Sequence, residues 1–248
     1  MNTININYQI SLMGNYAEIS PNPENVQYFV EHFIGKGFIP SVHPEYHFEL
    51  GDNPELNPKM KHMPRLRLSK GDNSWNITLL TNKIDFILAN IDISVFDMPD
   101  FDSFVADCKE FINIISNKYP NRHQRIGIIR NFLLSGHDEY IQRKFVKNPP
   151  IYDSKPLQQW TYNTVSKERV SNEVELNVIS AIQKINTPIT KNSQKVDFEG
   201  IQFSFDVNTI DDKVFRFNSM NVNSSIDKLV SVLSNTINET FSYIELNV

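Results

Sequence analysis

The chain has 248 residues, of which 40% are hydrophobic and 21% are charged, and its formal net charge is −5. This is the composition of a globular protein with a sizeable core, and it excludes a flexible linker-like chain. The acidic balance argues against a surface that binds polyanions over the whole molecule. Because Cys108 is the single cysteine, no disulfide can form within the chain, which fits a reducing compartment.

The N-terminal stretch MNTININYQISLMGNYAEI lacks a basic segment and a continuous apolar run, so we do not expect a signal peptide. No segment approaches the run of about 20 apolar residues that spans a bilayer. We therefore expect a cytoplasmic protein with no membrane partner.

The first elements are a strand at residues 4–13 and a helix within residues 21–38, with its start near Asn22. A polar, proline-rich loop is expected from there to about residue 63. Residues 64–96 then predict a meander of three antiparallel strands with one well-buried face.

The clearest helix lies within residues 97–120, where an apolar stripe recurs at helical spacing. The stripe consists of Phe101, Phe104, Val105, Cys108, Phe111, Ile112 and Ile115. Asp100 or Asp102 is expected to cap the first turn. Within the stripe, Cys108 is a small core residue and not a reactive thiol.

The second half begins with a strand at residues 125–136, and a loop or short helix follows at 138–156. Four further strands are expected at residues 157–167, 172–185, 198–208 and 214–220, the last two joined by a turn at 208–212. A long amphipathic helix at 223–244 completes the pattern.

Antiparallel strands in runs, punctuated by long helices, predict an α+β fold. We expect antiparallel sheet of about eight or nine strands, three long amphipathic helices, and a single domain over residues 1–248. Each half, 1–120 and 121–248, ends with strands followed by a long helix. An old duplication is therefore an open alternative.

Four stretches, NITLLTNKIDFILAN, FDSFVADCKEFINIISN, RIGIIRNFLL and INETFSYI, together with the order of elements, carry a family resemblance. The chain resembles a sporadically distributed family of bacterial proteins of about this length, over roughly residues 60–248. It departs from that family at the N-terminus, where ININYQISLM stands in place of a proline-led strand. The resemblance implies no catalytic residues. It implies a bacterial accessory protein, encoded beside mobile-element or phage-defence genes.

Three of the six histidines fall within SVHPEYHFELGDNPELNPKMKH, residues 41–62. His43 and His47 have a spacing that on a helix would suit zinc. Pro44 instead favours extended backbone at His43, in which four residues span roughly 13 Å, too far for one ion. We therefore predict no metal site and no cofactor, and His43, His47 and His62 are only weak candidates.

Two other patterns resemble catalytic sites. Residues 135–138, Ser-Gly-His-Asp, place triad residue types side by side, but adjacent residues rarely hydrogen-bond in the order that a triad needs. A turn at Gly136 and a helix cap at Asp138 are expected instead. The acidic residues near Asp100 open a helix, where the macrodipole favours them, so we predict no two-metal centre.

A basic stripe covers residues 118–147, which hold seven basic and two acidic residues, a local charge of +5. Such a stripe on an acidic protein points to an anionic partner. The candidate nucleic-acid-binding residues are Arg122, Arg125, Arg130, Arg143, Lys144 and Lys147. Interleaved aromatic residues such as Tyr140 could stack on bases.

No catalytic constellation emerges. We predict a non-catalytic accessory protein that binds another protein, either a different subunit or a second copy, in a multi-component system for defence, toxin neutralisation or regulation. Two alternatives stay open: an RNA-, DNA- or nucleotide-binding protein that uses the basic stripe, and a metal-dependent hydrolase that uses His43, His47 or His137. The exposed ends of the sheet are the expected contact surface.

Overall fold

The computed structural model describes residues 3–49, 59–120, 123–147, 157–170, 174–210 and 215–245. The strands are β1 (Ile4–Gly14), β2 (Phe38–Glu49), β3 (Lys59–Lys70), β4 (Trp75–Leu79), β5 (Lys83–Ala89), β6 (His123–Leu134), β7 (Thr161–Arg169), β8 (Glu175–Lys191) and β9 (Gln194–Thr209). The helices are α1 (Pro23–Phe33), the short 3₁₀ helix η1 (Ile34–Lys36), α2 (Phe101–Lys118), α3 (Asp138–Phe145) and α4 (Val222–Tyr243).

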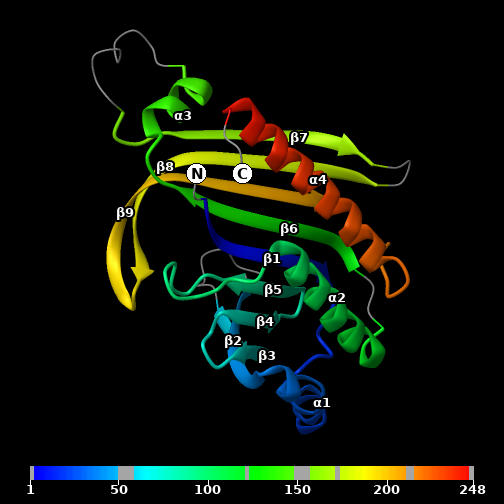
Figure 1. Cartoon of the computed structure of the whole chain (residues 1–248). Coiled ribbons are helices and arrows are strands. Elements are labelled where there is room, and N and C mark those ends of the chain that lie inside the picture. Colours follow the sequence, from blue (N-terminus) through cyan, green and yellow to red (C-terminus); the bar gives the residue numbers. More distant parts are fainter. Residues whose placement is uncertain are drawn as a thin grey trace.

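The nine strands of the described residues form one antiparallel sheet in the order β2-β3-β4-β5-β1-β6-β9-β8-β7. The predicted α+β class and the predicted sheet size are therefore confirmed. At the centre, β1 pairs with β6, so strands from both parts of the chain join in one sheet (Figure 1). The proposed duplication of residues 1–120 and 121–248 stays a prediction.

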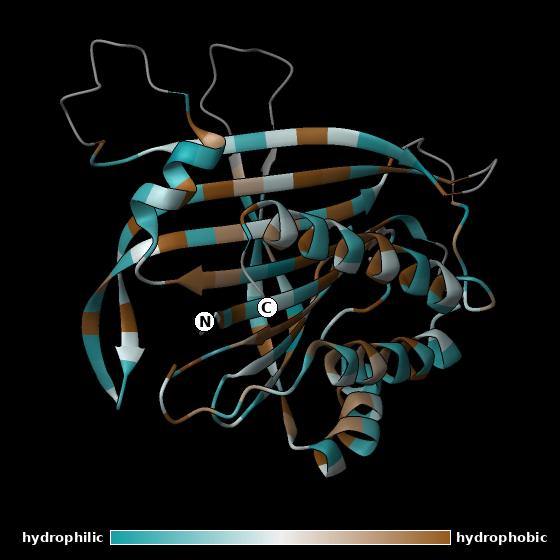
Figure 2. Ribbon diagram, turned by 45° about the horizontal axis from the view of Figure 1, so that its top comes forward, coloured by the Kyte–Doolittle hydropathy of each residue, from teal (hydrophilic) through white to brown (hydrophobic). Residues whose placement is uncertain are grey.

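Helices α2 and α4 lie across the same face of the sheet (Figure 1). The ring of Tyr8 on β1 packs against Phe101 of α2, with 5.2 Å between centroids. In the other part of the sheet, Phe132 and Phe203 pack against Phe241 of α4, at 6.0 and 5.1 Å. The hydrophilic residues of these helices turn outward, as the hydropathy colours show (Figure 2). The predicted amphipathic stripes of α2 and α4 thus form the core.

The opposite face of the central strands is polar, because successive residues of a strand point to opposite faces. Ser11 Oγ donates a hydrogen bond of 2.6 Å to Asp85, whose carboxylate also pairs with Lys83 at 2.7 Å. Farther along the same face, the Arg125 guanidinium donates to Asn208 Oδ1 at 2.7 Å. Cross-strand polar pairs therefore cover the side that lacks α2 and α4.

The loop expected up to residue 63 is a wrong prediction. Strands β2 and β3 pair from Phe38 opposite Lys70 to Glu49 opposite Lys59 and form a long hairpin. The prolines of this segment led to the wrong prediction, because proline has no backbone N–H and cannot occupy a ladder position that must donate a hydrogen bond. Pro44 faces Pro64 across the hairpin, and two prolines fit only a pair that exchanges no hydrogen bonds.

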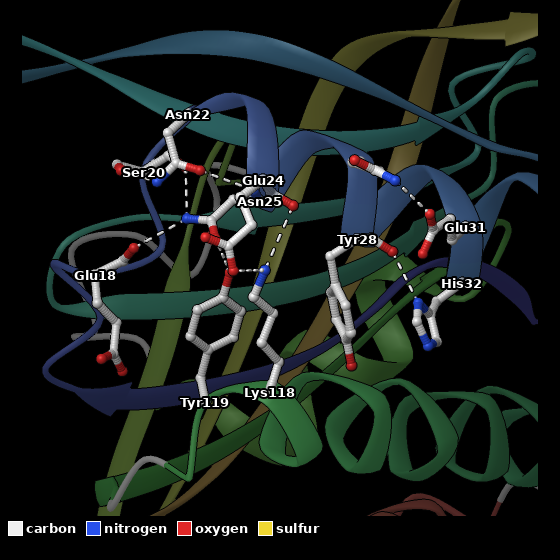
Figure 3. Close-up of polar contacts among 11 residues, drawn as sticks. Glu18, Ser20, Asn22, Glu24, Asn25, Tyr28, Glu31, His32, Lys118 and Tyr119 are labelled. Atoms are coloured by element: carbon white, nitrogen blue, oxygen red, sulfur yellow. Dashed lines mark hydrogen bonds and ion pairs between the residues drawn. The ribbon is translucent and has the colours of Figure 1, made fainter.

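Helix α1 is held against the end of α2 by polar contacts (Figure 3). Helix α1 starts directly after Asn22, close to the predicted start, and the Asn22 side chain caps it by accepting a hydrogen bond of 2.8 Å from the Asn25 amide. Asn25 Oδ1 accepts a hydrogen bond from the Tyr119 hydroxyl, and Lys118 pairs with Glu24 at 3.1 Å. These contacts fix α1 beside the first residue after α2.

Residues 215–220 do not pair with β9, so the strand predicted at 214–220 is wrong. Instead Phe217 forms an isolated bridge with His123, in which the two backbones exchange hydrogen bonds of 2.7 and 3.0 Å. The alternation of apolar and polar residues in this segment is too short to specify a strand, and α4 begins soon after it, at Val222. The predicted turn at 208–212 overlaps the end of β9, which runs to Thr209. Its residues 211 and 212, like residue 214, lie outside the described residues.

Candidate functional site

Strand β7 forms a free margin of the sheet. Among the strands that the structure describes, it pairs with β8 alone, and it lies at the end of the strand order (Figure 1). Eight of its nine residues are exposed, and Tyr162 is partly buried. Val165, at the middle of the strand, is 68% exposed. A strand with this exposure offers its outer backbone groups to solvent or to a partner.

The pairing with β8 shows which amides of β7 point outward. The Lys184 amide donates to the Trp160 carbonyl and the Val170 amide donates to the Val174 carbonyl, each at 3.1 Å. In each of these two pairs, the residues stand directly opposite each other in the β7–β8 register. Along an antiparallel ladder, hydrogen-bonded pairs of this kind alternate with non-bonded pairs. Even-numbered residues of β7 therefore bond to β8. The odd-numbered residues, with Val165 at the centre, point their N–H and C=O groups outward.

The other margin, β2, is protected. Pro44 occupies a non-bonded position of the β2–β3 ladder, at which the backbone nitrogen of β2 points away from β3. Pro40 lies four residues before Pro44 and so also occupies a non-bonded position, where it removes an N–H group that would point away from β3. Prolines on an edge strand blunt pairing with another chain. No proline interrupts β7, so β7 is the sheet edge better suited to accept a strand.

A cleft of about 450 Å³ adjoins β7 on the face that carries α4. Its lining residues are Lys144, Phe145, Tyr162, Thr164, Ser180, Ile182, Glu239, Thr240 and Tyr243. The ring of Phe145 lies 5.0 Å from that of Tyr162 and 5.5 Å from that of Tyr243. Because Tyr162 and Thr164 belong to β7, the cleft and the free edge form one continuous surface.

The cation at the cleft wall is Lys144, and it is already neutralised. Lys144 Nζ lies 3.3 Å from Glu245, whose carboxylate also accepts a hydrogen bond of 3.0 Å from the Tyr140 hydroxyl. The hydrogen bond to Glu245 raises the pKa of Lys144 above its usual value. A lysine that acts as a nucleophile needs the opposite shift. The arrangement therefore suits side-chain binding and does not activate an amine.

The histidines of the first metal hypothesis do not converge. His43 and His47 lie on β2, four residues apart in extended backbone. His47 Nε2 is 3.3 Å from Glu45, and the His62 ring makes an edge-to-face contact with Tyr46, with 5.5 Å between centroids. Across the described residues, no group of three or more histidine, cysteine, aspartate or glutamate side chains is placed to hold a metal ion.

The basic stripe is not gathered on one surface. Arg125 and Arg130 point to opposite faces of β6. Arg130 lies over the ring of Phe132 at 4.5 Å, on the face that carries the helices. Arg143 and Lys144 lie on α3, and both pair with glutamates. Lys147 follows α3 and is exposed, and Arg122 lies outside the described residues.

The triad-like segment is a turn before α3. Gly136 has a φ of +69°, a conformation that favours glycine, as predicted. The predicted cap at Asp138 is wrong by one residue, because His137 is the N-cap and Asp138 is the first residue of the helix. Asp138 instead pairs with Lys184 on β8, at 3.7 Å. At the start of α2, Asp100 accepts a hydrogen bond of 2.7 Å from the Ser103 amide, which confirms its predicted capping role.

Sequence reasoning missed the cleft. Tyr162 stands in a stretch that was predicted as a strand, and Tyr243 lies in the predicted last helix, but no pattern indicates that they meet through Phe145.

Comparisons with known protein families, curated proteins and solved structures found no match to this chain. The family resemblance over residues 60–248 therefore stays a prediction. None of the helices in the described ranges is long and apolar enough to cross a bilayer.

Proposed function

We propose that this chain is a non-catalytic accessory protein that binds an extended segment of a protein partner along β7. The partner segment adds to the sheet as a further antiparallel strand, and one of its side chains enters the cleft beside Tyr162. The observation that carries the proposal is the row of outward N–H and C=O groups on β7, next to a cleft with aromatic walls. Strand addition of this kind takes its affinity from main-chain hydrogen bonds and its specificity from side-chain pockets.

The alternative edge and the alternative functions have weaker support. Pro40 and Pro44 remove outward donors from β2, whereas β7 keeps all of its amides. The basic residues from 118 to 147 are divided between two faces of β6 and helix α3. A bacterial multi-component system remains the setting that we propose.

The experiment is a selection of displayed random peptides on the purified protein, followed by affinity measurement by fluorescence anisotropy. Val165→Pro removes one outward amide without touching an amide that bonds to β8. Val165→Thr keeps that amide and a β-branched side chain, so it is the matched control. We expect selected peptides to bind Val165→Pro at least tenfold more weakly than the wild type, and Val165→Thr with unchanged affinity.

Thermal melts establish that both variants are folded. Tyr162→Ala, in the cleft wall, separates backbone from side-chain recognition and should weaken only those peptides that carry a large apolar anchor. Equal affinity of the selected peptides for wild type and Val165→Pro would contradict strand addition on β7. So would a selection that enriches no peptide.

A further inference from the structure

We infer that the strand that adds to β7 in the free protein is β7 of a second copy of this chain. The inference rests on the proposed function, since it names the occupant of the same edge. Its basis is that the sequence of β7, TYNTVSKER, is complementary to itself when two copies run antiparallel.

The hydrogen-bonding pattern limits the registers that two copies can adopt. Outward groups belong to the odd-numbered residues of β7, so an odd residue must face an odd residue of the second copy. A two-fold axis through Val165 meets this condition and pairs the strand over its whole length from Thr161 to Arg169. Other two-fold registers leave at least one end of the strand unpaired.

The side chains agree with that register. Val165, which is 68% exposed, faces Val165 of the second copy, so two exposed apolar side chains cover each other. Thr164 faces Ser166, and Tyr162 faces Glu168. Pairs of β-branched or hydroxyl side chains across two strands stabilise a sheet by roughly 0.2–1 kcal/mol each.

The charges are compatible with this register. Lys167 faces Asn163 and Arg169 faces Thr161, so no like charges stand opposite each other. If the two-fold axis passed through Lys167 instead of Val165, Lys167 would stand opposite Lys167 of the second copy, and this like-charge pair would destabilise the dimer. Within the described residues, neither Lys167 nor Arg169 takes part in an ion pair that would compete.

The geometry has a consequence for the cleft. Two antiparallel strands in one sheet are related by a two-fold axis perpendicular to that sheet, so α4 of both copies lies on the same face. The two clefts, each with Tyr162 of β7 in its wall, then flank the seam. A peptide that binds by strand addition competes with the second copy for the same amides.

The first test measures the oligomeric state by sedimentation and native mass spectrometry over a range of concentrations. We expect a concentration-dependent dimer for the wild type and for Val165→Thr, and a monomer for Val165→Pro. A wild type that stays monomeric overturns the inference, and so does a dimer that persists in Val165→Pro.

The second test reports the register. In a hydrogen-bonded antiparallel pair the Cα atoms are about 5.5 Å apart, which a disulfide can bridge. Val165→Cys should therefore form a disulfide-linked dimer under mild oxidation. Thr161→Cys is the control, because two copies of residue 161 lie roughly 26 Å apart in this register. Native Cys108 is buried and does not compete. Efficient linking of Thr161→Cys, or none of Val165→Cys, overturns the register.

The two proposals fail separately. If the wild type is monomeric but selected peptides still lose affinity in Val165→Pro, the second copy is not the occupant and β7 remains the binding edge. If neither dimerisation nor peptide binding responds to Val165→Pro, both proposals are wrong.

Discussion

Tyr16 and His123 share a hydrogen bond inside the core, with 2.6 Å between Tyr16 Oη and His123 Nδ1. Neither side chain is accessible to solvent beyond 2%. Tyr16 follows β1 and His123 opens β6, so the bond joins the ends of two central strands that are neighbours in the sheet. Burial raises the pKa of Tyr16 and lowers the pKa of His123 to about 4. The imidazole is therefore neutral in the folded protein at pH 7.

This pair predicts a loss of stability in acid. Below the ordinary histidine pKa of 6.5, the unfolded chain binds a proton at His123 that the folded protein does not bind until about pH 4. The free energy of unfolding should therefore fall as the pH drops from 6.5 to 4, by up to about 3 kcal/mol from this group. Urea unfolding of wild type and His123→Gln at pH 7.5 and 4.5 measures it. The wild type should lose more stability than the variant, and equal losses would contradict the assignment.

Gly200, on β9, is expected to tolerate no side chain. A Cβ atom there would lie 2.5 Å from the Leu134 carbonyl oxygen and 2.8 Å from the Phe198 ring. Because the first neighbour is backbone, Gly200→Ala should lower the free energy of unfolding by about 1–3 kcal/mol. Gly35→Ala is the control, since nothing lies within 4 Å of its added Cβ, and it should change stability by less than about 0.5 kcal/mol. Chemical denaturation compares the two variants.

Arg65 lies midway along the β2–β3 hairpin, opposite His43, and connects it to the neighbouring chain. Its buried guanidinium donates to the carbonyls of Tyr16, Ala17 and Leu79 at 2.6, 3.2 and 3.1 Å, and lies 3.5 Å from Glu45. Removing it takes one donor from each of these carbonyls and takes the cation away from the Glu45 carboxylate, which is largely buried. Arg65→Met should therefore cost about 3–5 kcal/mol of unfolding free energy.

Two further variants test the geometry of that site. Arg65→Lys should recover only part of the stability, because an ammonium cannot reach three divergent carbonyls. Arg67→Met is the matched control on the same strand, since Arg67 is partly buried and its guanidinium, among the described residues, donates only to Asn76 Oδ1. Similar losses for Arg65→Met and Arg67→Met in urea denaturation would show that the carbonyl contacts of Arg65 contribute little.

Cys108 should be unreactive in the folded protein. The thiol is fully buried within the stripe of α2, and burial raises its pKa well above the ordinary value. Since the thiolate is the reacting species, labelling by an aromatic disulfide reagent should proceed only as fast as the protein unfolds. Labelling rates measured with increasing urea test this. Rapid modification in buffer alone would contradict the burial of Cys108.

The elements with strong local signals could be predicted. The stripe from Phe101 to Ile115 determines α2, because residues at helical spacing can share one buried face whatever they pack against. The alternation around Phe86 determines β5 in the same way. The hairpin of β2 and β3 was missed because Pro40 and Pro44 are unfavourable in most strands and are accepted here only by the edge position.

The sequence by itself determined the fold class, the buried faces of the helices and the burial of Cys108, since all of these depend on the periodicity of apolar residues over a few turns or strands. Only the tertiary structure decided that β1 lies beside β6, with Ile10 opposite Ile128, and hence which strand is left at the margin. Strand pairing joins residues far apart in the chain, and the backbone groups that pair are the same in every residue. No local pattern could therefore identify β7 as the free edge, or bring Tyr162 and Tyr243 to one cleft.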